Sequence, residues 1–189
     1  AMPDMDAPQF LHIYSLSRGH PLVLELINRG SVGGTFHATL ETFVEKEIFS
    51  RLSGSEKSVL GAIAIYREPM PLEALSSHEI ETDLLDDLVE KGLARQADSE
   101  NYDVHDLVRE FLLRTIDKQN ATTLHNAACD WYRSRIDTPE QQLEYIYHLV
   151  NAGDVDTLSK MLGEHGQDLV QAGHVELLPL IGELNASQI

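Results

Sequence analysis

The chain has 189 residues, 42% of them hydrophobic, which is enough for one large or two small domains, and its apolar stretches are too short to span a bilayer. Acidic residues number 31 against 14 basic ones, so the formal net charge of −17 repels phosphate backbones except where basic side chains gather locally. The single cysteine, Cys129, excludes an intrachain disulfide framework, and the first residues do not resemble a signal peptide, so we predict a cytoplasmic protein.

Residues 1–43 form the first part of the chain. Short helices are predicted over Leu11–Ser17 and Leu22–Asn28, with Gly19-His20-Pro21 between them and Pro21 near the first turn of the second helix, where proline is tolerated. Two short helices bury too little apolar surface for an independent core. We therefore expect this part to be the remnant of a domain whose body lies upstream.

Residues 44–118 form the second part. A helix over Phe43–Arg51 is followed by Ser53 and Glu56, which have the spacing of a capping box and precede apolar residues at helical spacing. A short helix is predicted over Leu72–Leu75 and a third helix over Glu79–Lys91. Two strands follow, Leu93–Gln96 and Tyr102–Val104, joined by the polar turn Asp98–Asn101. A closing helix is predicted over Asp106–Ile116. Three helices, a hairpin and a closing helix are the layout of a winged helix.

Residues 119–189 are predicted to be entirely helical and to contain an internal repeat. The segment Leu149–Leu158 aligns with Leu169–Leu178 at an offset of 20 residues, with six of ten positions identical. Gly153 and Gly173 stand at the same place in the two copies and would each end a helix. The expected fold class is therefore mainly α, a winged helix followed by helical hairpins like those of tetratricopeptide (TPR) repeats.

The third helix of the predicted winged helix decides whether this domain reads DNA. Its only base is Lys91, whereas it carries six acids, namely Glu79, Glu81, Asp83, Asp86, Asp87 and Glu90. A helix that enters the major groove needs outward-facing Arg, Lys, Asn or Gln. We therefore expect no DNA binding through this surface, which is either a solvated helix face or a protein-docking surface.

Residues that carry chemistry are sparse. Cys129 lies inside a helical apolar stripe, where a structural role is favoured over that of a nucleophile. The nine histidines are scattered, no His-x-x-x-His or Cys-x-x-Cys spacing occurs, and no Gly-x-x-x-x-Gly-Lys-Ser/Thr loop is present. The sequence therefore predicts no catalytic residue and no metal site, and the chain by itself is not expected to be an enzyme.

Two short motifs stand out against this background. One is Gly19-His20-Pro21 before an apolar helix, and the other is Val104-His105-Asp106 at the predicted junction between strand and closing helix. Taken singly, the first is a common helix start and the second a common cap. Their order, with a winged helix between them and helical repeats after them, resembles the STAND class of signal-transduction ATPases from about residue 10 onward.

The resemblance implies roles for four residues. Residues 1–43 would be the remnant of the ATPase lid region, from which Pro21 would pack near the adenine of a bound nucleotide, with Gly19 allowing the close approach. His105 would contact the β-phosphate of ADP and hold a closed, inactive state, and Asp106 would stabilise the local turn. The family motif has Met where this sequence has Val104, an apolar-for-apolar change.

The resemblance also implies what this chain does not itself carry. The family's phosphate-binding loop, its Mg²⁺-binding acid and its parallel sheet are absent from the sequence. ATP or ADP with Mg²⁺ would therefore belong to the complete protein and not to this fragment. The implied partners are the missing nucleotide-binding domain and proteins bound by the repeats, with no membrane partner.

Three functions remain open on the sequence alone. The first is a regulatory arm of a STAND ATPase that senses bound nucleotide and relays its state to the repeats. The second is a protein-interaction adaptor without a nucleotide role, and the third is a winged-helix transcription regulator. The stimulus, the output domain and the oligomeric state do not follow from the sequence.

Overall fold

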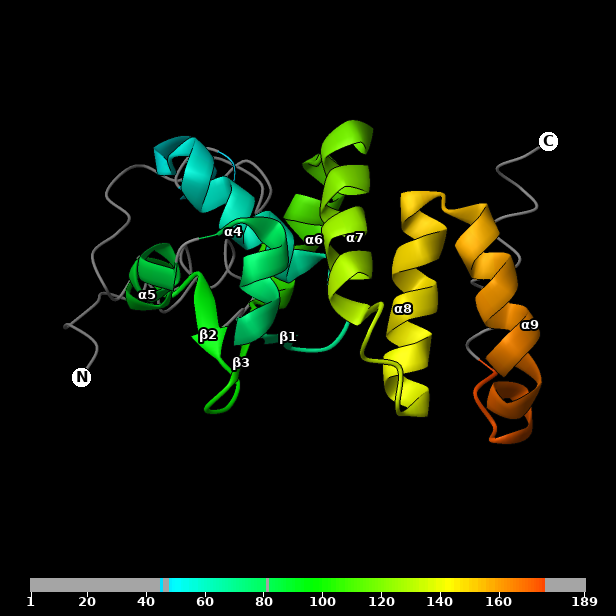
Figure 1. The fold of residues 1–189 in the computed structure, drawn as a ribbon. Coiled ribbons are helices and arrows are strands. Elements are labelled where there is room, and N and C mark those ends of the chain that lie inside the picture. Colours follow the sequence, from blue (N-terminus) through cyan, green and yellow to red (C-terminus); the bar gives the residue numbers. More distant parts are fainter. Residues whose placement is uncertain (1–44, 46–47, 81, 176–189) are drawn as a thin grey trace, which may run out of the picture. The chain divides into compact units, whose positions relative to one another are not determined.

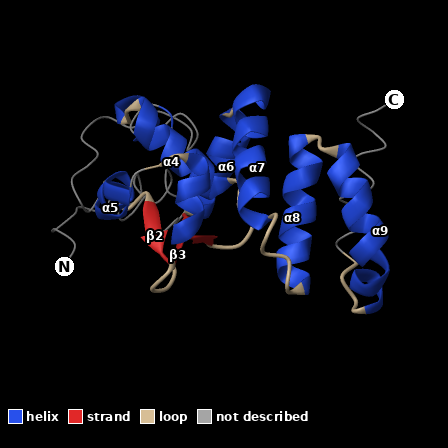
Figure 2. Cartoon of the chain, in the orientation of Figure 1, coloured by secondary structure: helices blue, strands red, loops and turns tan. Residues whose placement is uncertain are grey.

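A computed structural model describes residues 45, 48–80 and 82–175 of the chain. The described part of the chain is mainly helical (Figures 1 and 2). The contacts within the chain divide it into two compact units. Among the described residues, unit 1 comprises 45, 48–64 and 82–115, and unit 2 comprises 65–80 and 116–175. None of the described helices combines the length and the apolarity that a bilayer crossing requires.

Unit 1 is built around helix α4 (Gly54–Ala64), which follows the short 3-10 helix η2 (Phe49–Arg51). The predicted capping box is confirmed, because the Glu56 backbone N–H donates to Ser53 Oγ (3.2 Å) and the Ser53 N–H donates to Glu56 Oε2 (2.7 Å). Glu56 also binds the ammonium group of Lys91 through its other oxygen. One side chain therefore starts α4 and ties it to the segment after α5.

The second half of α4, residues 59–64, is buried. Val59, Leu60 and Ile63 are at most 1% exposed, and α4 contacts α5 (Thr82–Glu90), strand β3 (Asn101–Val104) and α6 (Asp106–Thr115). On α5, Leu85 and Leu88 face this core. Burying a side chain of this size contributes about 1.5–3 kcal/mol, so α4 and its neighbours form the core of unit 1.

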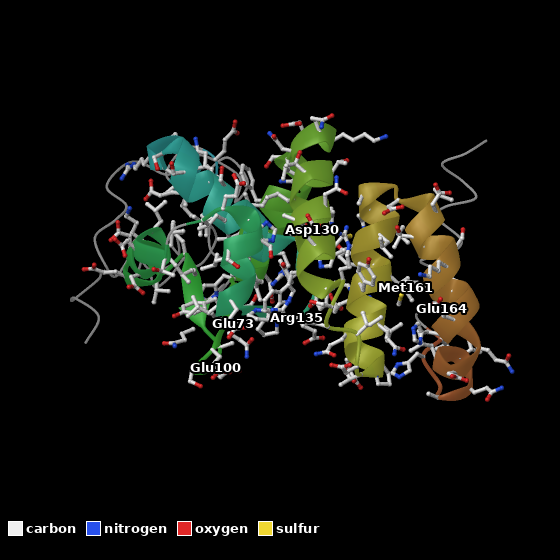
Figure 3. All side chains as sticks on the ribbon, in the orientation of Figure 1. Glu73, Glu100, Asp130, Arg135, Met161 and Glu164 are labelled. Carbon is white, nitrogen blue, oxygen red and sulfur yellow. The ribbon has the colours of Figure 1, made fainter. Side chains whose placement is uncertain are left out.

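The β-hairpin of unit 1 pairs β2 (Ala94–Gln96) with β3 in antiparallel register, Ala94 opposite Val104 and Gln96 opposite Tyr102. Asp98 shapes its turn, since Asp98 Oδ1 accepts hydrogen bonds from the backbone N–H groups of Glu100 (2.8 Å) and Asn101 (2.9 Å). An aspartate that binds the backbone two and three residues ahead stabilises such a turn. Glu100 lies at the tip of the hairpin (Figure 3).

The elements expected over Leu72–Ile116 occur in the predicted order, with boundaries that shift by one to three residues. The third helix begins at Thr82, not at Glu79, because Glu79 adopts a left-handed conformation (φ 56°) at the end of the 3-10 helix η3 (Leu72–His78). Of the helix expected over Phe43–Arg51, residues 43, 44, 46 and 47 lie outside the described residues, and Phe49–Arg51 form the 3-10 helix η2.

Unit 2 contains strand β1 (Met70–Pro71), η3 and three long helices, α7 (Lys118–Tyr132), α8 (Pro139–Ala152) and α9 (Val155–Gln171). Helix α7 contacts both η3 and α8, and α8 contacts α9, as Figure 1 shows for the three long helices. Thr138 and Gln141 form a capping box at the start of α8. Asp117 and Asp154 cap α7 and α9 with their carboxylates.

The 20-residue repeat reproduces the same hydrogen bonds in its two copies. Asp154 N–H donates to Leu149 O (3.1 Å), and its counterpart, His174 N–H, donates to Leu169 O (3.0 Å). The N–H groups of Gly153 and Gly173 likewise reach the carbonyls three residues earlier, and both glycines have positive φ, 78° and 96°. The repeated sequence therefore encodes a helix stop, and in the first copy α9 follows at once. Residues 176–178 of the second copy lie outside the described residues.

Gly153 should be difficult to replace, and α9 offers a matched control. Gly153→Ala places a Cβ at φ 78°, which costs about 1 kcal/mol of unfolding free energy although nothing crowds the site. Gly163→Ala, in the interior of α9 with equally open surroundings, should instead stabilise by about 0.5–1 kcal/mol. Urea unfolding followed by the fluorescence of Trp131, the only tryptophan, measures both changes. Equal effects of the two substitutions would contradict the assigned role of Gly153.

Candidate functional site at the junction of β3 and α6

The His105-Asp106 pair lies where the sequence predicted, between a strand and a helix. His105 is the single residue between β3 and α6, is partly exposed, and accepts a hydrogen bond from Arg109 N–H through its backbone carbonyl (2.9 Å). Asp106 is exposed and is the first residue of α6, so its carboxylate lies at the positive end of the helix dipole. Gly19 and Pro21 lie outside the described residues, so the structure does not place them near His105.

A buried carboxylate holds this junction in place. Asp103, 8% exposed, accepts hydrogen bonds through Oδ2 from Arg95 Nε (3.2 Å) and Nη2 (2.5 Å). Its Oδ1 accepts one from the Val104 N–H (2.8 Å) and one from Arg109 Nη2. Arg109 also donates to the Ala64 carbonyl at the end of α4 (2.8 Å). We call Asp103, Arg95 and Arg109 the junction brace, because they connect α4, β2, β3 and α6 on either side of His105.

The charge of Asp103 survives burial because two guanidinium groups compensate for it. Burial alone would raise the pKa of this carboxyl, but the hydrogen bonds of Arg95 and the charge and hydrogen bonds of Arg109 outweigh burial and lower the pKa. A carboxylate with this many charge-assisted hydrogen bonds has little freedom to move. The backbone of the next two residues, Val104 and His105, is therefore held in a defined position.

Sequence reasoning missed the brace, although it left signals. Arg95 and Asp103 stand directly opposite each other in the hairpin, so the register that pairs Gln96 with Tyr102 also pairs these two charges. Arg109 lies one turn into α6, where a long side chain reaches back over the strand it follows. These pairings require the turn length, which the polar segment Asp98–Asn101 left undefined.

The predicted acidic surface is present on unit 1. On α5, Asp83, Asp86, Asp87 and Glu90 are exposed, opposite the buried Leu85 and Leu88. The neighbouring hairpin turn, with Asp98 and Glu100, is acidic and exposed as well. No described residue of α5 supplies a positive charge to oppose these acids. Lys91, which follows α5, is bound by Glu56, so the excess negative charge of this face repels phosphate backbones.

Cys129, the other residue considered for chemistry, is 5% exposed in α7. Burial, with smaller contributions from Asp154 and Asp130, raises the pKa of its thiol to about 12. A thiol with that pKa stays protonated at neutral pH and is a poor nucleophile.

Unit 2 carries a hollow of about 460 Å³ lined by residues from the α7–α8 connection, α8 and α9. Its polar lining mixes both signs of charge, with Arg133 and Lys160 beside Asp156 and Glu164. Met161 and Glu164 come from α9 (Figure 3). Because neither sign dominates, the hollow selects no single class of charged ligand.

Comparison with known proteins gives a likeness of fold. No protein-family model and no curated protein sequence matches the chain. The crystal structure of a Signal Transduction ATPase with Numerous Domains (STAND) protein with a tetratricopeptide repeat sensor, from Pyrococcus horikoshii, is similar with a TM-score of 0.65 and 24% sequence identity. The match covers 86% of this chain and 24% of that chain, so the chain spans about a quarter of the length of that protein. The mainly helical architecture is thus one that occurs within a STAND protein.

The junction brace should be sensitive to loss of one charge. Asp103→Asn leaves the partly buried Arg109 without its counterion, and we expect a loss of about 2–4 kcal/mol in local stability. Hydrogen exchange of the α6 amides, above all the Arg109 N–H, should accelerate accordingly. Asp86→Asn, which removes the same charge from the exposed face of α5, should leave exchange within about 0.5 kcal/mol of the unmodified chain. If the α6 amides of the Asp103→Asn variant exchanged as slowly as those of the unmodified chain, the brace would not hold the junction.

Duplex DNA should not be retained by the chain, even at low ionic strength, where electrostatic attraction is strongest. The reason is the exposed acid on α5 and on the hairpin turn. Fluorescence anisotropy of a labelled duplex in about 20 mM salt measures this, with a basic DNA-binding protein as the positive control. Binding that weakens steeply as salt is added would contradict the charge argument and favour a transcription regulator.

Proposed function

We propose that this chain is the regulatory arm of a STAND-type signal-transduction ATPase, with a winged helix that senses bound nucleotide and TPR-like repeats that receive the signal. The observation that carries the proposal is the likeness of fold to a STAND protein with a tetratricopeptide repeat sensor, over 86% of the chain. The winged-helix assignment is supported by the helices, hairpin and closing helix that occur in the expected order.

His105 is the residue of the proposed sensor. It is partly exposed at a junction whose backbone the junction brace holds, and an imidazole N–H donates readily to a phosphate oxygen. Because the brace fixes the backbone from which this imidazole extends, less conformational entropy is lost when the ligand binds. The β-phosphate of ADP is the proposed acceptor, in the state in which a nucleotide-binding domain closes on this one.

Among the described residues at the junction, few groups are available to hold a nucleotide. The arginines of the junction brace, Arg95 and Arg109, are both engaged by Asp103, and Asp106 adds a negative charge beside His105 in the sequence. The donors for the remaining phosphate oxygens and for Mg²⁺ would therefore come from the nucleotide-binding domain. Asp106 would stabilise the turn at the start of α6. Pro21 would pack near the adenine, and Gly19 would allow this close approach.

The proposal is tested in the complete protein that contains the nucleotide-binding domain. His105→Ala removes one charge-assisted hydrogen bond of about 1.5–3 kcal/mol, so ADP affinity should fall at least about tenfold and basal signalling should rise. His165→Ala, on α9 of unit 2, is the control and should leave both unchanged. Titration with a fluorescent ADP analogue measures the affinity.

The outcomes separate the alternatives. Unchanged ADP affinity in His105→Ala would reject the sensing role. A complete protein with no nucleotide-binding domain would support the adaptor, in which winged helix and repeats serve only protein contacts. The 189-residue chain by itself should bind ADP only weakly, because its sequence contains no Gly-x-x-x-x-Gly-Lys-Ser/Thr phosphate-binding loop.

A further inference from the structure

Three histidines that lie far apart in the sequence meet inside unit 2. His78 ends η3, His125 belongs to α7 and His148 to α8, so each comes from a different element. His148 is 0% and His125 4% exposed. Within the described ranges, no set of three or more histidine, cysteine or acidic side chains is placed to hold a metal ion. We call these three residues the histidine cluster.

The cluster is joined by hydrogen bonds and enclosed by aromatic rings. Nδ1 of His125 lies 2.9 Å from Nδ1 of His148, and the Tyr66 hydroxyl lies 3.0 Å from Nε2 of His78. The rings of Tyr66, Tyr147 and Tyr132 lie 4.9, 5.2 and 5.6 Å from that of His148. These contacts connect η3, α7 and α8 with the segment that carries Tyr66.

The hydrogen-bond geometry fits neutral imidazoles. An Nδ1–Nδ1 contact of 2.9 Å holds one hydrogen, donated by one ring to the lone pair of the other. If both rings were protonated, two N–H groups would point at each other. His148 Nε2 and His78 Nδ1 are buried and have no hydrogen-bond partner among the described residues, so a proton added there would bring a charge without an acceptor.

The charged groups around the cluster do not compensate for added protons. Glu144, one turn before His148 on α8, is engaged through Oε1 by Arg67 Nε (2.8 Å) and Nη2 (2.7 Å). Arg67 lies over the Tyr147 ring at 4.7 Å, and its positive charge opposes protonation of His148. The negative charge of Glu68 raises the pKa values of Glu144 and Tyr132.

The remaining titratable neighbours are neutral. Burial raises the pKa values of the Tyr66 and Tyr132 hydroxyls and of the Cys129 thiol. None of these groups therefore carries a negative charge near neutral pH that would favour an imidazolium ion.

We propose that the histidine cluster is an acid-sensitive lock, which holds η3, α7 and α8 together while its three imidazoles are neutral and releases unit 2 when they take up protons. The proposal concerns unit 2 alone and does not rest on the proposed nucleotide sensor in unit 1.

The direction of the pH effect follows from the two states. Burial lowers the pKa of His78 and of His125 to about 4, and burial followed by the charges of His125, His78 and Arg67 lowers that of His148 well below its usual value. In the unfolded chain each is about 6.5. Stability is therefore complete above about pH 6.5 and is lost as the pH falls toward 4, because only the unfolded chain binds protons in this window.

Glu144 acts in the opposite direction. Burial raises its pKa against the influence of Arg67, so the folded state holds its proton more tightly than the unfolded chain does. The stabilisation that Glu144 contributes is present in acid and is lost as the pH rises through the pKa of its carboxyl in the folded chain. One such group offsets the effect of at most one of the three histidines.

Urea unfolding of the whole chain between pH 5 and pH 8 tests the proposal. Trp131 in α7 is the only tryptophan, so its fluorescence reports unit 2. Near pH 5, each histidine should raise the unfolding equilibrium constant about tenfold for every unit by which the pH falls. The three together should raise it about a thousandfold per unit, before the offset from Glu144. An unfolding equilibrium constant that does not depend on pH would overturn the proposal. An unfolding constant that falls in acid, because protonated His148 forms an ion pair with Glu144, would overturn it as well.

Variants and a direct titration divide the effect among the residues. His78→Gln, His125→Gln and His148→Gln should each reduce the pH dependence by about one proton. His165→Gln, a partly exposed histidine of α9 in the same unit, should leave the dependence unchanged. NMR of the ring carbons in the unmodified chain needs no substitution. Cluster imidazoles that titrate near pH 6.5 in the folded protein would overturn the proposal even if a variant failed to fold.

Discussion

The arrangement of unit 1 depends on one buried negative charge. A carboxylate with 8% exposure is unstable unless its lone pairs are filled by cationic donors, and Asp103 obtains them from β2 and from α6. Because Arg109 also holds the last carbonyl of α4, a shift of any of these elements would leave a polar group unpaired. The position of His105 is a consequence of this network, since only Val104 separates it from the braced carboxylate. A sensor residue on such a junction would move only together with α6.

Unit 2 solves the same physical problem with neutral groups. Its interior contains imidazoles and phenols that share hydrogens, and its buried acid, Glu144, is held by Arg67 at the side of the cluster. An ion pair of the kind found in unit 1 tolerates mild acid, because its carboxyl titrates below the usual range. A neutral imidazole pair does not tolerate it. The two units therefore differ in the solution conditions that each can withstand, although both bury polar side chains.

Local signals in the sequence predicted local structure well. The capping box at Ser53 and the helix stops at Gly153 and Gly173 are confirmed, because the first is a contact between residues three apart and each of the two glycines has positive φ. The predicted start of α5 was wrong, because no local sequence pattern indicates the left-handed conformation of Glu79. The partners of Asp103 and the meeting of the histidines needed tertiary structure, since His125 and His148 are 23 residues apart and join only when two helices pack. The roles expected of Gly19, Pro21, His105 and Asp106 remain predictions.

The end of α8 has a consequence for how such a protein can grow. At Gly153 the chain closes one helix and, two residues later, opens the next with the carboxylate of Asp154, all within the repeated segment. The same backbone hydrogen bonds recur 20 residues on. Each copy thus brings its own stop signal, so a hairpin could be duplicated or deleted in the gene without redesign of its neighbours. Variation in repeat number, and with it in the length of the surface presented to partners, would then require only changes in multiples of one self-terminating helix.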